Sequence, residues 1–149
     1  MNLRKYIILL IFNSLSVFSQ KNSQQLKVEI TNIQNSRGVI LVAIYDSEET
    51  FLDEPLQYKI VAIDSTTKFP TSIETFFEGL KVGQYAVSVY HDENENWELD
   101  RNWIGIPKEM FGFSNNARAK FSPPTFEECS VDIIQSEFSK ALEIRLRNW

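Results

Sequence analysis

The residues that could do chemistry in this sequence are concentrated between His91 and Asp100, which read His-Asp-Glu-Asn-Glu-Asn-Trp-Glu-Leu-Asp. Oxygen-bearing side chains stand at every second position of this stretch: Asp92, Asn94, Asn96, Glu98 and Asp100. A loop that curls around a hard cation presents its ligands in this alternating way, as in the first half of the D-x-[DN]-x-[DN]-G calcium loop. The stretch therefore predicts a Ca²⁺ site.

The acidic stretch departs from a complete calcium loop at two positions. Trp97 stands at the sixth position, where a glycine makes the sharp turn, and Trp103 stands at the twelfth, where a bidentate glutamate closes the shell. An EF-hand is therefore excluded. One remaining interpretation is a shorter cation loop, closed by Asp100 or by groups from elsewhere, with a dissociation constant of about 10⁻⁴ to 10⁻³ M. The other is a solvated turn in which Asp and Asn side chains bond their own backbone.

Few groups in this sequence are candidates for catalysis. His91 is the only histidine, and a general base also needs a substrate pocket within reach. Cys129 is the only cysteine, and a lone cysteine is more often buried than paired with histidine as a nucleophile. Glu98 and Asp100 are the acids that glycoside hydrolysis would use. We expect a non-enzymatic binding or interaction module; the alternative is a hydrolase acting on an envelope or carbohydrate substrate through His91 and its neighbouring acids.

Two further groups of residues are candidates for ligand contact. Four aromatic side chains either stack on a partner or belong to the core, and core is the commoner case: Trp97, Trp103, Phe111 and Phe113. Trp97 lies inside the acidic loop and, of the four, is the one expected to be exposed. Three polar residues either brace the loop through backbone hydrogen bonds, the simpler role, or contact an anionic ligand: Asn115, Asn116 and Arg118.

The N-terminal sequence predicts export. Arg4 and Lys5 precede an apolar run at 6–12, and small residues follow up to Ser19, which is the order of a secretory signal peptide cleaved after residue 19. The alternative is an uncleaved membrane anchor, but the apolar run is short for a bilayer span. We therefore expect one periplasmic or extracellular domain over residues 20–149, without a transmembrane segment after cleavage.

Charge and cysteine content narrow the classes of partner. The 149-residue chain has a formal charge of −5, and removal of residues 1–19 leaves 13 Lys+Arg against 20 Asp+Glu, or −7. A surface this acidic argues against nucleic-acid binding. A single cysteine cannot form an intramolecular disulfide. The stability of the fold must therefore come from the hydrophobic core, since 43% of the residues are apolar, or from a metal. The expected partner is an unidentified protein or carbohydrate ligand.

Short alternating segments predict the elements that position these groups. Strands are expected at 27–31, 39–45, 58–63, 72–77, 86–90, 131–134 and 141–146, with helical turns at 47–52 and 125–129. Residues 92–124 show no sustained period apart from an extended piece at 103–106, and their many apolar side chains predict an ordered loop excursion. Leu80, Gly83 and Tyr85 have the spacing of a tyrosine corner, although an ordinary glycine turn fits equally well. These elements predict an antiparallel β-sandwich.

The chain also resembles a known family over nearly all of its length, from about Leu26 to the end. The resemblance rests on the stretches 85–94 and 99–100, on Gly-Ile-Pro at 105–107, on Gly-Phe-Ser-Asn-Asn-Ala-Arg at 112–118 and on Pro-Thr-Phe at 124–126. The sequence is similar to the small exported bacterial proteins catalogued as domain of unknown function 2141. That resemblance implies an immunoglobulin-like or prealbumin-like sandwich and no established activity. Where the family usually has glycines in the acidic loop, this chain has Glu95 and Trp97; if the family's loop binds a cation, this difference implies weaker or different binding here.

Overall fold

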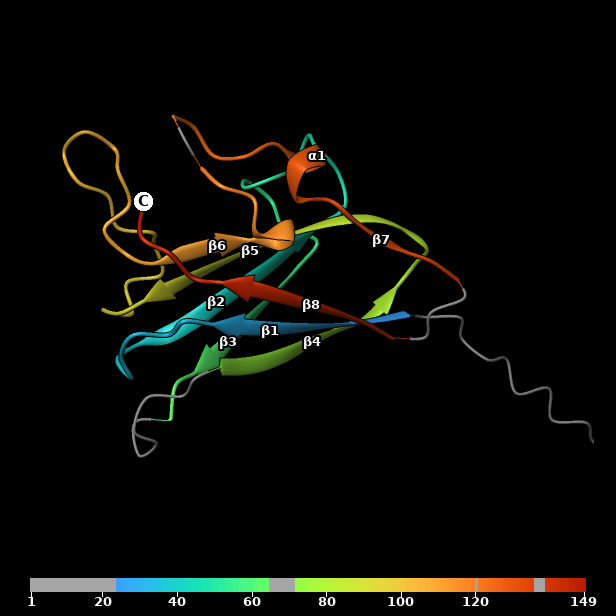
Figure 1. Ribbon diagram of the computed structural model, residues 1–149, viewed down its shortest axis with the longest axis horizontal. Coiled ribbons are helices and arrows are strands. Elements are labelled where there is room, and N and C mark those ends of the chain that lie inside the picture. The colour runs from blue at the N-terminus through green and yellow to red at the C-terminus, as the bar shows by residue number, and fades with distance from the viewer. Residues whose placement is uncertain (1–23, 65–71, 120, 136–138) are drawn as a thin grey trace, which may run out of the picture.

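A computed structural model describes residues 24–64, 72–119, 121–135 and 139–149 (Figure 1). The signal peptide expected at residues 1–19 lies outside these ranges, so export stays a prediction. Within them, no helix has both the length and the apolar character needed to span a bilayer.

The described residues form two packed β-sheets. One sheet has the order β4-β1-β8, with β4 at Ser72–Leu80, β1 at Gln24–Thr31 and β8 at Ser139–Arg145. The other has the order β3-β2-β5-β6, with β3 at Gln57–Ala62, β2 at Val39–Tyr45, β5 at Gly83–Asp92 and β6 at Phe111–Phe113, and β7 (Val131–Ile133) also pairs with β5. The all-β sandwich is confirmed. One pairing differs from a purely antiparallel arrangement, because β1 and β8 run parallel.

The core lies between the two sheets and follows the alternation seen in the sequence. Leu26, Val28 and Ile30 of β1 are fully buried, and the residues between them are half-buried. On β2, Ile40, Val42 and Ile44 face the same core. β2 is central in its sheet, between β3 and β5, which agrees with its continuous apolar sequence.

A tyrosine corner fixes the start of β5. The Tyr85 hydroxyl donates to the Lys81 carbonyl at 3.1 Å and accepts the Lys81 N–H at 3.2 Å, and the tyrosine is buried. The corner suggested by the Leu-Gly-Tyr spacing is therefore confirmed. Because β5 is anchored at this end, the position of His91 and Asp92 at its other end is well defined.

The long excursion after β5 contains elements that the sequence pattern did not show. Strand β6 pairs with β5 within it, and a 3₁₀ turn, η1 (Ser114–Asn116), follows directly. The extended piece predicted at 103–106 is wrong: the Asn102 side chain accepts the N–H groups of Ile104 (3.0 Å) and Ile106 (2.9 Å), which bends the chain into a tight turn. The helical turn near 125–129 is confirmed as α1 (Phe126–Cys129), which Thr125 and Glu128 cap reciprocally.

Candidate functional site

The candidate site begins with Asp92, the last residue of β5. Asp92 pairs with Val39 across the sheet and is fully buried. Its carboxylate accepts two backbone N–H groups of the following loop, from Asn96 at 3.2 Å and from Trp97 at 2.8 Å. A buried carboxylate with such partners is well satisfied, so Asp92 holds the first turn of the loop against the sheet.

Asn94, Asn96 and Asp100 continue this arrangement. The Asn94 side-chain oxygen accepts the Asn96 N–H at 3.1 Å, and the Asn96 side-chain oxygen accepts the Glu98 N–H at 2.9 Å. Their amide groups donate to the two Asp100 oxygens, at 2.9 Å from Asn94 and 3.1 Å from Asn96. The structure therefore brings together four of the five residues proposed as ligands. The Glu98 side chain is exposed and, within the described residues, forms no hydrogen bond with the other four.

Glu109 completes the loop from a position that the sequence analysis missed. Its carboxylate accepts the N–H of Glu93 at 3.1 Å and of Asp100 at 3.0 Å, so it ties the two ends of the acidic stretch together. It is buried, and burial raises its pKa above the ordinary value, with the nearby Asp92 and Asp100 carboxylates adding to the shift. The sequence contains one sign of this role: Glu109 is an isolated acidic residue directly before the apolar Met-Phe pair that leads into β6.

The loop adopts left-handed backbone at the two positions where glycine was expected from the family resemblance. Glu95 has a φ of 58° and Trp97 a φ of 69°. A side chain at positive φ is unfavourable, so other contacts must hold the turn in place. Asp92, which accepts the Trp97 N–H, and the Tyr90 hydroxyl, which donates to the Trp97 carbonyl at 3.1 Å, are those contacts.

The oxygens of the acidic loop make the contacts of a hydrogen-bonded turn. Within the described ranges, no three Asp, Glu, His or Cys side chains are placed to hold a metal ion together. The oxygens of Asp92, Asn94 and Asn96 accept backbone N–H groups, which is the contact pattern of the solvated turn. Ca²⁺ binding by Asp92, Asn94, Asn96, Glu98 and Asp100 stays a prediction.

His91 and Cys129 are both buried away from solvent. The His91 Nε2–H donates to the Arg37 carbonyl at 2.7 Å, and its Nδ1 has no partner among the described residues. Gly38 packs so closely on this strand end that a Cβ there would lie 1.9 Å from the Asp92 carbonyl oxygen. Burial raises the pKa of the Cys129 thiol to about 12, which keeps it protonated. Neither residue lines the two cavities described next.

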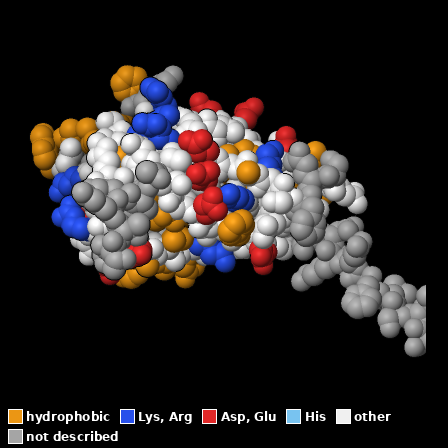
Figure 2. Space-filling view, turned by 60° about the horizontal axis from the view of Figure 1, so that its bottom comes forward, with side chains coloured by type: hydrophobic (Ala, Val, Ile, Leu, Met, Phe, Trp, Pro, Cys, Tyr) orange, Lys and Arg blue, Asp and Glu red, His pale blue; other side chains and the backbone are white. Residues whose placement is uncertain are grey.

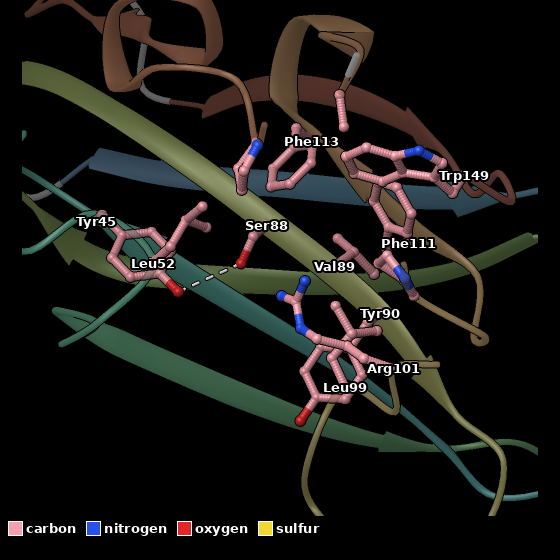
Figure 3. Close-up of a pocket in the computed structure, with 13 residues that line it drawn as sticks. Tyr45, Leu52, Ser88, Val89, Tyr90, Leu99, Arg101, Phe111, Phe113 and Trp149 are labelled. Carbon is pink, nitrogen blue, oxygen red and sulfur yellow. Dashed lines mark hydrogen bonds between the residues drawn. The ribbon is translucent and has the colours of Figure 1, made fainter. Parts of the chain in front are cut away.

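An aromatic cavity of about 190 Å³ lies beside the acidic loop (Figure 3). Tyr45 and Leu52 form one side, Phe111 and Trp149 form the other, and Arg101 extends between them toward Ser88. The Tyr45 and Ser88 hydroxyls are 3.4 Å apart. Tyr90 also contributes to the wall, and its pKa rises to about 12 because of burial and the nearby carboxylates of Asp92 and Glu109. The cavity is therefore mainly apolar, with one cation and a few neutral hydroxyl groups.

A second cavity, of about 210 Å³, shares the Phe113 and Trp149 walls of the first. Its polar lining includes three arginines, namely Arg118, Arg145 and Arg147, and no acidic residue. Of the carboxylates in the described ranges, none forms a salt bridge with these arginines. The cavity therefore has the charge of an anion site.

The aromatic residues divide between core and surface. Phe111 and Phe113 are buried, as the core interpretation expects, whereas Trp97 is 54% exposed and Trp103 is 94% exposed. The expectation that Trp97 is exposed is confirmed. Trp103 is more exposed because it sits at the tip of the turn formed by Asn102, beyond the reach of the sandwich.

Asn115 and Asn116 make the contacts of the bracing role. The Asn115 amide donates to the carbonyls of Glu128 (3.2 Å) and Ser130 (2.8 Å). Asn116 donates to the Glu143 carbonyl at 3.1 Å and accepts the Arg145 N–H at 2.9 Å, so it joins η1 to β8. Both have positive φ, which asparagine tolerates better than most residues. Arg118 is exposed, has no such contact among the described residues, and is one of the residues that line the arginine-lined cavity.

Comparison with known proteins identifies a family but no activity. No curated protein and no solved structure matches the chain. Residues 28–140, from β1 to the start of β8, match the family described as "Uncharacterized protein conserved in bacteria (DUF2141)". The matched segment includes the tyrosine corner, the acidic loop, Glu109 and the Ser-Asn-Asn turn. Since this is well over half of its length, the chain belongs to that family of uncharacterized bacterial proteins, as the resemblance of its motifs indicated.

Proposed function

We propose that this protein is an exported, non-enzymatic interaction module whose binding face is the loop end of the sandwich. Three segments of the described chain form that face: the loop at 93–110, residues 117–119 with 121–125, and the C-terminal residues 145–149. The observation that carries the proposal is their convergence around two adjoining cavities, one aromatic and one lined by arginines. Clefts that combine apolar walls with a few polar groups are the usual form of binding sites.

The contacts of the reactive residues favour binding over hydrolysis. A general base must reach a substrate, yet the His91 ring lies in the interior with Nε2 bonded to the Arg37 carbonyl. The Cys129 thiol is buried and protonated, which suits a structural cysteine. The hydrolase alternative through His91 stays a prediction without support from these contacts.

We propose in addition that Ca²⁺ orders the acidic loop that borders the face. Asp92 and Glu109 are buried, and Asp100 lies beside them, but no Lys or Arg of the described ranges forms a salt bridge with any of the three. These three side chains are not placed to hold an ion together in this structure, but their charges repel one another, and a divalent cation that drew them closer would relieve that repulsion. Glu109 would then take the closing role for which the sequence has no glutamate at the twelfth loop position.

The calcium component is tested by melting and calorimetry of the protein without its signal peptide. With a dissociation constant of about 10⁻⁴ to 10⁻³ M, Ca²⁺ at about 10 mM should stabilise the native state by about 1.4 to 2.7 kcal/mol. Asp100→Asn and Glu109→Gln should remove both the heat and the melting shift, whereas Asp132→Asn, on β7, should retain them. Equal calcium effects in all three variants would refute the site.

The binding face is tested by NMR chemical-shift mapping with defined probes: phospholipid vesicles, peptidoglycan fragments and oligosaccharides. Any probe that binds should perturb amides of 93–110, 117–119 and 145–149, around the two cavities. Perturbations confined to β3, β4 or the turn at Lys81–Val82 would show that the binding face lies elsewhere. This readout does not depend on which probe binds or on whether Ca²⁺ is needed.

A further inference from the structure

We propose that the partner of the loop end is an anionic phospholipid surface. Trp103, Ile104 and Phe121 enter the boundary between headgroups and acyl chains, and the arginines of the second cavity hold headgroup phosphates. The inference rests on the proposed function in one respect, that the loop end is the binding face, and it goes further by naming the partner. It does not depend on the calcium component.

The first support is the exposure of large apolar side chains at two separate tips. Trp103 is 94% exposed and Ile104 is 55% exposed at the tip of the 93–110 loop, and Phe121 is fully exposed on the next segment. The 93–110 loop extends beyond the left end of the sheets, whereas residues 117–119 and 121–125 rise above β6 (Figure 1), and both segments contribute to the wall of the aromatic cavity. Aromatic side chains that protrude singly from loops suit the membrane–water interface, which is apolar on the acyl-chain side and hydrated on the headgroup side.

The second support is the backbone of the Trp103 tip, where several polar groups are already paired within the turn. The N–H groups of Ile104 and Ile106 donate to the Asn102 side chain, and the Gly105 N–H donates to the Asn102 carbonyl at 2.9 Å. Arg101 donates from its guanidinium to the Gly105 carbonyl at 3.1 Å. An unpaired backbone group makes entry into a lipid boundary unfavourable, so each of these pairings lowers the free-energy cost of placing the turn at the headgroup level, where water remains available to the other tip groups.

The third support is the charge of the segment that carries the tips. Over residues 93–121, four basic residues stand against five acids, but four of these acids precede the tip, at positions 93–100, and residues 101–121 contain four basic residues against the single acid Glu109. The Glu109 carboxylate is buried at the base of the loop, away from the tip. Figure 2 shows hydrophobic and basic side chains gathered at the end that carries these loops. Basic residues beside apolar side chains are the pattern that binds anionic lipid.

The fourth support is the arginine-lined cavity. Arg118 and Arg145 are exposed, and Arg147 is half-buried, where it also donates to the Asn116 carbonyl at 3.4 Å. Guanidinium groups bind phosphate oxygens strongly and directionally. The cavity shares Trp149 and Ala119 with the aromatic cavity, and Ala119 is two residues from Phe121. A phosphate in this cavity and an acyl chain beside Phe121 could therefore belong to one lipid molecule.

A carbohydrate partner fits the same surface less well. Sugar recognition combines an aromatic platform with several free hydrogen-bonding groups beside it. Next to Trp103, however, the Asn102 side-chain oxygen and the Gly105 carbonyl already have partners within the turn. The neighbours of Trp103 in the turn are instead the exposed Ile104 and the cationic Arg101, which favours the lipid.

The test is vesicle flotation of the full mature chain, with phosphatidylcholine alone and with added phosphatidylglycerol, in EDTA and in millimolar Ca²⁺. The wild-type protein should float with the anionic vesicles. Trp103→Ser and Phe121→Ser should each lower the partition coefficient about tenfold. Arg118→Gln with Arg145→Gln should lower it for the anionic vesicles alone. The control is Val82→Ser, which removes an exposed apolar side chain at the opposite end of β5 and should leave flotation unchanged.

Three outcomes would overturn the proposal. Failure of the correctly folded wild-type protein to float with either vesicle would do so. Binding of inorganic phosphate or glycerophosphate without vesicle binding would assign the arginines to a free anion instead. Retention on insoluble peptidoglycan, lost in Trp103→Ser, without vesicle binding would assign the aromatic tips to a carbohydrate. The calcium shift and the NMR map are measured without vesicles in separate samples, so the proposed function can stand if the lipid inference fails.

Discussion

The most informative perturbation of the acidic loop is Glu95→Gly. Glu95 is exposed, has a φ of 58°, and its side chain forms no hydrogen bond or ion pair in the described part of the chain. A non-glycine residue in the left-handed region costs about 1–2 kcal/mol, whereas glycine costs about 0.4–1 kcal/mol through the greater freedom of the unfolded chain. Because nothing else is lost, Glu95→Gly should raise the free energy of unfolding by about 0.5–1 kcal/mol.

The matched control lies three residues further along the same loop. Glu98 is also exposed, but its φ is negative, so glycine there brings no relief of backbone strain. Glu98→Gly should therefore lower the free energy of unfolding by about 0.4–1 kcal/mol. Urea denaturation of both variants beside the wild-type protein measures the two signs. If Glu95→Gly destabilises the protein as much as Glu98→Gly does, the loop does not hold Glu95 in the left-handed conformation and the reasoning fails.

Three further predictions concern the supports of the site. Tyr85→Phe should lower the free energy of unfolding by about 1–2 kcal/mol in chemical denaturation, because the Lys81 N–H and carbonyl both lose their partner; an unchanged midpoint would contradict the corner. Gly38→Ala should lower the free energy of unfolding by about 3–5 kcal/mol, because its Cβ would lie 1.9 Å from the Asp92 carbonyl oxygen. Gly79→Ala, where a Cβ would meet open space, should lower it by about 1 kcal/mol because of the φ of 75°. Similar losses in the two variants would show that the contact with Asp92 is unimportant. Because the pKa of Glu109 is raised in the native state, the wild-type free energy of unfolding, minus that of Glu109→Gln, should decrease as the pH rises above 4.5. Thermal melting of both proteins over this pH range measures the difference, and an increase with pH would contradict the burial of this carboxylate.

The sequence predicted the sandwich well because its strands depend on local alternation. β1 and β8 each keep apolar residues at alternate positions that face the core, where Val28 and Ile144 are fully buried and Leu142 is partly buried. The tyrosine corner could also be predicted, since its motif consists of three residues within six positions. These features follow from contacts between neighbours in the chain, and short-range patterns record such contacts directly.

The loop end was harder to predict because its geometry depends on contacts distant in sequence. β6 has only three residues, too few for a period to appear, and it exists because β5 supplies its partner. Glu109 reaches the acidic stretch only after the chain has turned back at Asn102. The parallel pairing of β1 with β8 joins segments more than one hundred residues apart, and no local pattern distinguishes it from an antiparallel one.

The two proposals are linked by electrostatics in a way that can be measured. The base of the loop carries Asp92, Asp100 and Glu109, while the arms toward the tip carry Arg101 and Lys108. Acidic groups within about 10 Å of an anionic membrane reduce the attraction that the basic groups supply. A Ca²⁺ ion bound at the base would cancel part of that opposing charge, so vesicle affinity should rise with calcium. By reciprocity, anionic vesicles should then raise the calcium affinity by the same factor. Lipid binding that is equally strong in EDTA would mean that the tips and the arginines act independently of the acidic loop.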